Sequence, residues 1–213
     1  MNINKHLILL FSVLFFLFAV SVSSGCFRKN ESDVKSVVRN ELDQLKNLDS
    51  ETTQKYIPYT ELFPDATENT DLTDEINETF SLFFRKFNYK ISDVIVGTAN
   101  HSATVSVKLT TIDSKVLARD FKAELLRTQI TESAQAQKGN IKDSSRSLEA
   151  HYLILNHLLN TNDYDTAETD CNIQLVNTGN NKKEKWKIQR TNSLEDDLVG
   201  GLMNDLTDPD ILS

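Results

Sequence analysis

The stretch that decides the fold runs from Phe83 to Ile91 and reads Phe83-Phe84-Arg85-Lys86-Phe87-Asn88-Tyr89-Lys90-Ile91. Around its start, apolar residues recur every three or four positions, as they do on one face of a helix: Ile76, Phe80, Phe83, Phe84 and Phe87. From Tyr89 onward, apolar and polar residues alternate, which is the period of a half-buried strand. The stretch therefore predicts a helix from about Leu72 that leads directly into a β-strand.

Two alternating runs predict an antiparallel hairpin. The first holds Tyr89 and Ile91 and then, after an expected bulge at Ser92-Asp93, Val94 and Val96. The second alternates through Ala103, Val105, Val107 and Leu109, and the turn-forming residues 97–102 separate the two runs. One face of this hairpin is expected to be buried and the other wet. We expect the aromatic helix to dock on the buried face.

The second half of the chain repeats the order of helices followed by a hairpin. A long helix is expected from Asp113 or Ser114, fading into residues 135–145, and another over residues 148–159. The second hairpin is predicted from alternating residues on both sides of a turn at 177–181, namely Cys171, Ile173 and Leu175, then Trp186 and Ile188. Asn192 with Glu195 is typical of a capping box, and predicts one last helix through Leu202 that Gly200-Gly201 weaken.

The segment before the aromatic helix adds a helix from Asn30 or Ser32, with a short helix or turn within residues 51–63. Strands gathered in two hairpins with helices between them predict an α+β fold. We expect a curved antiparallel sheet of about four strands packed against several helices in a cone-like shape. One domain over residues 32–206 is expected, with a C-terminal tail over residues 207–213.

The first 26 residues predict export. Lys5 precedes an apolar run from Leu7 to Val22 that is too short to span a bilayer as a helix and closes on small residues. Ser24-Gly25-Cys26 resembles the lipobox of bacterial lipoproteins, in which a diacylglycerol is attached to the cysteine and the signal is removed just before it. The resemblance implies a signal peptide over residues 1–25, a lipidated Cys26 with a short tether to residue 31, and the extracytoplasmic face of the cell membrane. Ordinary secretion with Cys26 as an incidental thiol is the alternative.

A second resemblance concerns the domain. The segment from Phe83 to Ile91, followed by Ala103-Thr104-Val105-Ser106-Val107 and a helix from Asp113, is similar to small domains of uncharacterised Gram-positive lipoproteins. Those domains are similar in fold to nuclear transport factor two and to cystatin-like domains. The resemblance implies a curved sheet that wraps helices, and it implies no particular activity because this type of fold hosts many functions.

Charge and cysteine content exclude some classes of function. Removing Lys5 with the signal leaves 22 basic and 31 acidic residues, a net charge of −9. That sign disfavours binding to nucleic acid or to anionic lipid headgroups. Beyond Cys26 the only cysteine is Cys171, so an internal disulfide is not possible once Cys26 is lipidated.

Candidate catalytic residues are few. His151 and His157 lie about 240° apart around one helix, too far to hold one metal ion together, and we predict no metal and no cofactor. Cys171 is expected on the buried face, where a thiol is unreactive. An isomerase-like site would need a buried carboxylate near a tyrosine, for which Asp93 or Asp120 with Tyr89 or Tyr152 are the candidates.

A pocket at the open end of the sheet is the remaining possibility. The pattern favours four residues for its lining: Tyr89, Phe121, Tyr152 and Trp186. Our leading hypothesis is a lipid-anchored, non-enzymatic module that binds an envelope protein or a small apolar ligand, and no nucleic acid. A small-molecule enzyme of the cone-shaped type and a structural envelope protein without a ligand are the alternatives.

Overall fold

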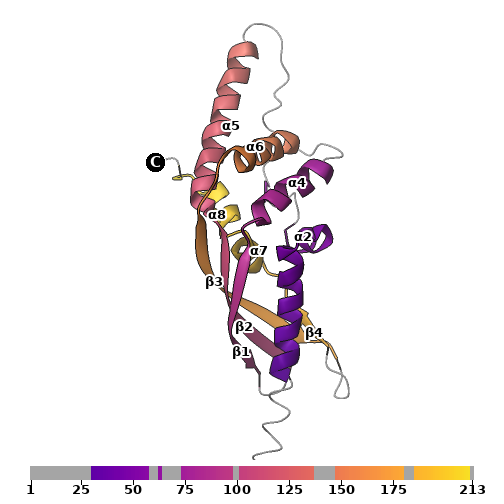
Figure 1. Cartoon of the computed structure of the whole chain (residues 1–213). Coiled ribbons are helices and arrows are strands. Elements are labelled where there is room, and N and C mark those ends of the chain that lie inside the picture. The colour runs from indigo at the N-terminus through magenta and orange to yellow at the C-terminus, as the bar shows by residue number, and fades with distance from the viewer. Residues whose placement is uncertain are drawn as a thin grey trace, which may run out of the picture.

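The computed structural model describes residues 30–57, 62–63, 73–97, 101–136, 147–179 and 185–211. Its strands form one open antiparallel sheet in the order β1-β2-β3-β4, with helices packed against it, so the α+β prediction is confirmed (Figure 1). The strands are β1 (Asn88–Val96), β2 (Ser102–Ile112), β3 (Thr166–Asn177) and β4 (Trp186–Ile188). Residues 30–46 form an N-terminal helix, and the later helices are α2 (Ser50–Tyr56), α4 (Thr73–Phe84), α5 (Ser114–Ala136), α6 (Leu148–Thr161), α7 (Asn192–Leu198) and α8 (Leu202–Thr207).

The two predicted hairpins are β1–β2 and β3–β4, and β2 pairs with β3 between them. The register of β1 shifts between Ile91 and Asp93, which confirms the bulge expected at Ser92-Asp93. Along β2 the predicted inward residues Ala103, Val105, Val107 and Leu109 are all buried. The β2–β3 ladder runs from Ser102 opposite Val176 to Ile112 opposite Thr166.

Strand β3 begins five residues before the alternation that predicted it at Cys171. Residues Thr166 to Asp170 include exposed polar side chains on one face and carry no apolar alternation. They are nevertheless strand because they pair with residues 108–112 of β2. Backbone pairing with β2 therefore defines this part of the strand, which its own apolar pattern does not indicate.

The aromatic stripe of α4 lies in the core, with Phe80, Phe83 and Phe84 all buried. α4 packs chiefly along α6, where the rings of Phe80 and Tyr152 are 6.1 Å apart, and it also contacts β2. The predicted contact with the hairpin therefore exists, but α4 meets α6, a helix that follows in the chain, more extensively than it meets the hairpin.

The N-terminal helix runs antiparallel to β1. Near its end the Lys46 ammonium donates to Asn88 Oδ1 at 2.9 Å, and Tyr89 contacts Asp43 one turn earlier. Asn30 is already helical and buried, so the expected tether through residue 31 reaches into the helix. Val34, Val38, Leu42 and Leu45 face the core.

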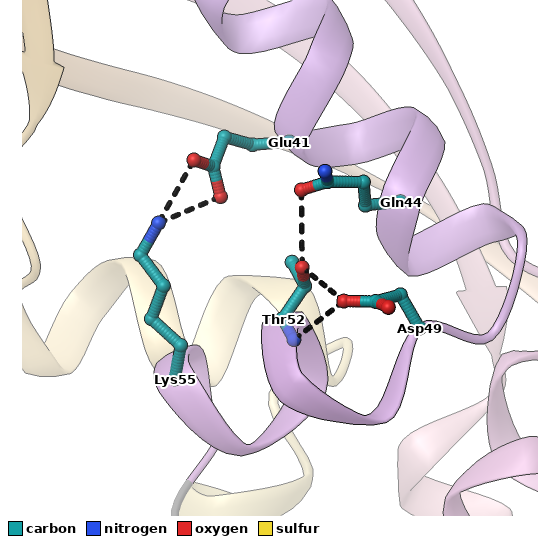
Figure 2. Close-up of polar contacts among 5 residues, drawn as sticks. All are labelled: Glu41, Gln44, Asp49, Thr52 and Lys55. Atoms are coloured by element: carbon teal, nitrogen blue, oxygen red, sulfur yellow. Dashed lines mark hydrogen bonds and ion pairs between the residues drawn. The ribbon is translucent and has the colours of Figure 1, made fainter.

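A tight turn joins this helix to α2. Asp49 N donates to Gln44 O at 3.0 Å and Leu48 has a φ of 62°, the geometry of a helix end that closes through a left-handed residue. Asp49 then caps α2, because its Oδ2 accepts from Thr52 N at 2.8 Å (Figure 2). The Thr52 hydroxyl donates to the same oxygen at 2.6 Å, and the hydrogen bonds from the Thr52 hydroxyl and backbone N–H lower the pKa of Asp49.

The last predicted helix is two helices, and its cap lies one residue earlier than expected. Thr191, not Asn192, accepts from Leu194 N at 3.1 Å. α7 ends at Leu198, Gly200 and Gly201 take φ angles of 68° and 91°, and α8 begins at Leu202. The glycine pair therefore separates α7 from α8, where weakening of a continuous helix was expected.

The glycine turn and α8 lie against the start of α5. Asp113 caps α5 weakly through Val116 N at 3.4 Å. Ser114 is buried, and its hydroxyl oxygen lies 2.6 Å from Gly200 O and 2.6 Å from Asp205 Oδ2.

We predict that Gly200→Ala is more destabilising than Gly201→Ala. Both glycines have positive φ, which costs an alanine about 1 kcal/mol. A Cβ on Gly200 would also lie 2.3 Å from Thr111 Oγ1, whereas one on Gly201 would meet nothing closer than 3.7 Å. Overpacking adds about 1–3 kcal/mol. Urea unfolding of the two variants measures the difference, and equal midpoints would contradict the close approach.

Candidate functional site

Two of the four residues predicted to line a pocket meet in the core. The ring of Phe63 stacks on Phe121 at 5.2 Å and meets Tyr152 edge-on at 5.2 Å. His151, on the same helix as Tyr152, belongs to the same group, and the centre of its ring lies 5.1 Å from that of Phe63. Tyr152 is 0% exposed and Phe121 3%, so this aromatic group is a packed part of the interior.

The other two residues lie at opposite edges of the sheet. Tyr89 is on the edge strand β1, and Trp186 is on the other edge strand β4, opposite Asn177 and buried. The structure therefore does not bring Tyr89 and Trp186 together. The two surface pockets described below are lined by other residues.

The carboxylates considered for acid–base chemistry have other partners. Asp93 is exposed and its Oδ1 accepts from Val94 N at 2.9 Å. Asp120 accepts from the Tyr164 hydroxyl at 3.2 Å and forms an ion pair with Arg119 at 3.1 Å. The contact of Asp120 with Tyr164 holds α5 against the chain after α6.

Tyr89 forms a tyrosine–carboxylate pair that the sequence did not indicate. Its hydroxyl donates to Asp43 Oδ1 at 2.5 Å. Burial of the phenol, then the hydrogen bond to Asp43 and its negative charge, raise the pKa of Tyr89 to about 12. The phenol is therefore protonated at neutral pH and connects the N-terminal helix to β1. Asp43 and Tyr89 are far apart in the sequence, and no local pattern connects them.

Cys171 lies on the inward face of β3, as predicted, and is 2% exposed. Burial and the neighbouring Asp197 carboxylate raise the pKa of its thiol, and burial raises the pKa of Asp197 as well. Since the thiolate is the nucleophilic form, this environment makes Cys171 unreactive.

An acidic surface pocket of about 640 Å³ lies along α7 and α8. It is lined by Asn192, Ser193, Glu195, Asp196, Asp197, Met203, Asn204 and Thr207. The carboxylates have protein partners: Asp196 accepts from Asn204 N at 3.2 Å, and the buried Glu195 pairs with Arg190. Within the described ranges, no group of three or more His, Cys, Asp or Glu side chains could hold a metal ion.

A second pocket, which we call the bulge pocket, lies between the N-terminal helix and the β1 bulge and has a volume of about 430 Å³. It is lined by Glu31, Ser32, Lys35, Ile91, Ser92, Asp93 and Val94. Charged groups of both signs therefore line one hollow. It lies beside the first turns of the N-terminal helix, and Figure 1 shows the end of the domain at which this helix begins.

The C-terminal turns of α5 form a projecting arm, residues 122–135, at the other end of the molecule (Figure 1). The first turns of α5 bury Leu117, Ala118 and Phe121, whereas no residue of the arm is buried. Leu126 and Ile130, one helical turn apart, are 49% and 62% exposed.

Comparisons with protein-family models, with characterised proteins and with solved structures find no match to this chain. None of the helices within the described residues is long and apolar enough to cross a membrane.

We predict that Tyr89 ionises near pH 12. A raised pKa means that the fold favours the neutral phenol, so its stabilising effect is complete below pH 10 and is lost as the pH rises from about 10 to about 12. Titration of tyrosine absorbance for the wild type minus Tyr89→Phe isolates this group. A difference spectrum that appears at pH 10 would show an unperturbed phenol.

Proposed function

We propose that this chain is a lipoprotein held at the extracytoplasmic face of the cell membrane through Cys26, and that its domain is a non-enzymatic module that binds a partner protein of the envelope. The anchor is supported by the apolar run from Leu7 to Val22 followed by Ser24-Gly25-Cys26. Cys26 lies outside the described residues. The observation that carries the binding role is the exposed apolar pair of Leu126 and Ile130 on the α5 arm.

The shape of the domain suits this division of roles. The N-terminal helix is already formed at Asn30, so three residues separate the domain from Cys26, a reach of at most about 14 Å. The α5 arm projects from the opposite end of the domain (Figure 1). A chain anchored at Cys26 would therefore present the arm away from the bilayer.

The contacts of the reactive side chains favour binding over catalysis. Cys171 is buried beside a carboxylate, Tyr89 donates to Asp43, and the hydroxyl of Ser114 lies against Gly200 O. Each group is engaged in joining elements of the fold. An enzyme would instead need such groups to face an open cavity.

The arm has the pattern of a helix that docks in a groove. Leu126 and Ile130 lie on one face at a spacing of four residues, flanked by the Glu124–Arg127 ion pair at 2.7 Å. Exposed apolar anchors at this spacing with polar flanks are typical of helices that insert into an apolar groove of a partner protein. The partner we propose therefore presents such a groove.

Replacement of Cys26 tests the anchor. Two acyl chains bury many CH₂ groups at about 0.8 kcal/mol each, so the wild-type chain should fractionate with membranes and Cys26→Ala should not. Cys171→Ala is the matched control and should stay with the membrane fraction. If Cys26→Ala loses its signal and still fractionates with membranes, the lipid anchor is wrong.

Site-specific photocrosslinking in intact cells tests the arm. A photoreactive residue at Ile130 should give a crosslinked product with one partner protein, and the same residue at Ile95 should not, although Ile95 is 60% exposed on β1. Leu126→Ser should reduce the yield. A product at twice the mass of the chain would show that a second copy is the occupant, and equal products at both positions would exclude a specific arm.

A further inference from the structure

The bulge pocket is formed by an irregularity in an edge strand. Ile91 pairs with Val107 and Asp93 with Ser106, so Ser92 is the extra residue of β1. The Ser92 hydroxyl donates to Ser106 O at 3.0 Å, which fixes the bulge. Asp93 uses Oδ1 for Val94 N and leaves its second oxygen without a partner in the described part of the chain.

Within the described residues, the charged side chains of this pocket form no ion pair with one another. Glu31 and Lys35 are four residues apart on the N-terminal helix, a spacing at which glutamate and lysine commonly pair. Among the described residues, however, the structure has no ion pair or hydrogen bond for either side chain. One ammonium and two carboxylates, those of Glu31 and Asp93, therefore line the same hollow.

We infer that the bulge pocket binds the phosphoethanolamine headgroup of a lipid in the bilayer that carries the anchor. The phosphate would lie at Lys35 and the Ser32 hydroxyl, because both donate to phosphate oxygens. The ligand's ammonium would lie between Glu31 and Asp93, and the partly exposed Ile91 and Val94 would contact its carbon atoms.

The location selects a lipid as the source of this zwitterion. The pocket includes the first turns of the N-terminal helix, within a few residues of Cys26, so headgroups would surround it if the anchor is as proposed above. An anionic phosphoglycerol headgroup fits the bulge pocket less well. The pocket already holds two carboxylates and one ammonium, and the carboxylates would repel a headgroup without a positive charge. That the ligand comes from the bilayer rests on the proposed anchor. That the pocket recognises phosphoethanolamine rests on its own residues and does not depend on the anchor.

A titration with short-chain lipids tests the pocket directly. The full chain, held in nonionic detergent, is titrated with dihexanoylphosphatidylethanolamine while its backbone amides are followed by NMR. We expect shifts confined to residues 31–35 and 91–94, and affinity about tenfold weaker in Lys35→Gln. Lys185→Gln is the matched control, since Lys185 is exposed and outside the pocket, and should bind as the wild type does.

Two further ligands test whether the pocket prefers an ethanolamine headgroup and whether the ligand is a lipid or a free headgroup. Dihexanoylphosphatidylglycerol should bind more weakly than the ethanolamine lipid. In the Asp93→Asn variant, the difference in affinity between the two lipids should be smaller than in the wild type. Free phosphoethanolamine binding as tightly as the lipid would overturn the bilayer source. Equal binding of both lipids by the wild type, unchanged binding by Lys35→Gln, or no shifts in the pocket would overturn the site. Because the lipid is added from solution, failure here leaves the fractionation test of Cys26 unaffected.

Discussion

The antiparallel ladder between β2 and β3 is the constraint on which the rest of the structure depends. It joins the two hairpins into one sheet and gives the helices one continuous apolar face, with Val105 opposite Ile173 and Val107 opposite Cys171. On the outer face, Thr104 pairs with Gln174 and Ser106 with Asn172, each directly opposite its partner at 2.9 Å. Lys108 forms a diagonal pair with Glu168 at 3.0 Å. A slip of one residue would expose the apolar face and bury this polar one, so both faces fix the register.

Most of the fold could be predicted because its elements leave a local signal. The change of period at Tyr89 located the helix-to-strand junction, and the interruption at Ser92-Asp93 located the bulge. The two helices at the C-terminus were predicted as one because Gly200-Gly201 was interpreted as weakening a continuous helix. The two glycines instead take positive φ angles and donate back to the end of α7, and the turn they form makes a tertiary contact. That contact, between the glycine turn and Thr111 and Ser114, joins segments far apart in the sequence.

The candidate site was harder to predict because it depends on how distant elements meet. The expected pocket placed four aromatic residues together, yet strand order puts Tyr89 and Trp186 at opposite edges and draws Phe121 and Tyr152 into the core around Phe63. Phe63 follows an irregular segment, and its position could not be read from periodicity. The pairing of Tyr89 with Asp43 likewise follows from the antiparallel course of the N-terminal helix along β1, which sequence spacing does not specify.

The α5 arm differs from every other long element in what stabilises it. The N-terminal helix, α4 and α6 are held by buried apolar faces, whereas the arm has no buried residue after Phe121. Leu125 still packs against the core and Lys122 donates to Asp208 O. Beyond these two contacts, the helix of the arm rests on intrinsic propensity and on local pairs such as Glu124–Arg127, each worth only a few tenths of a kcal/mol. Helices of about 14 residues are marginal on such terms alone, and the β-branched Thr128, Ile130 and Thr131 lower the propensity further. A partner that covered Leu126 and Ile130 would supply the burial that the arm lacks, so binding there would stabilise the helix itself as well as the complex.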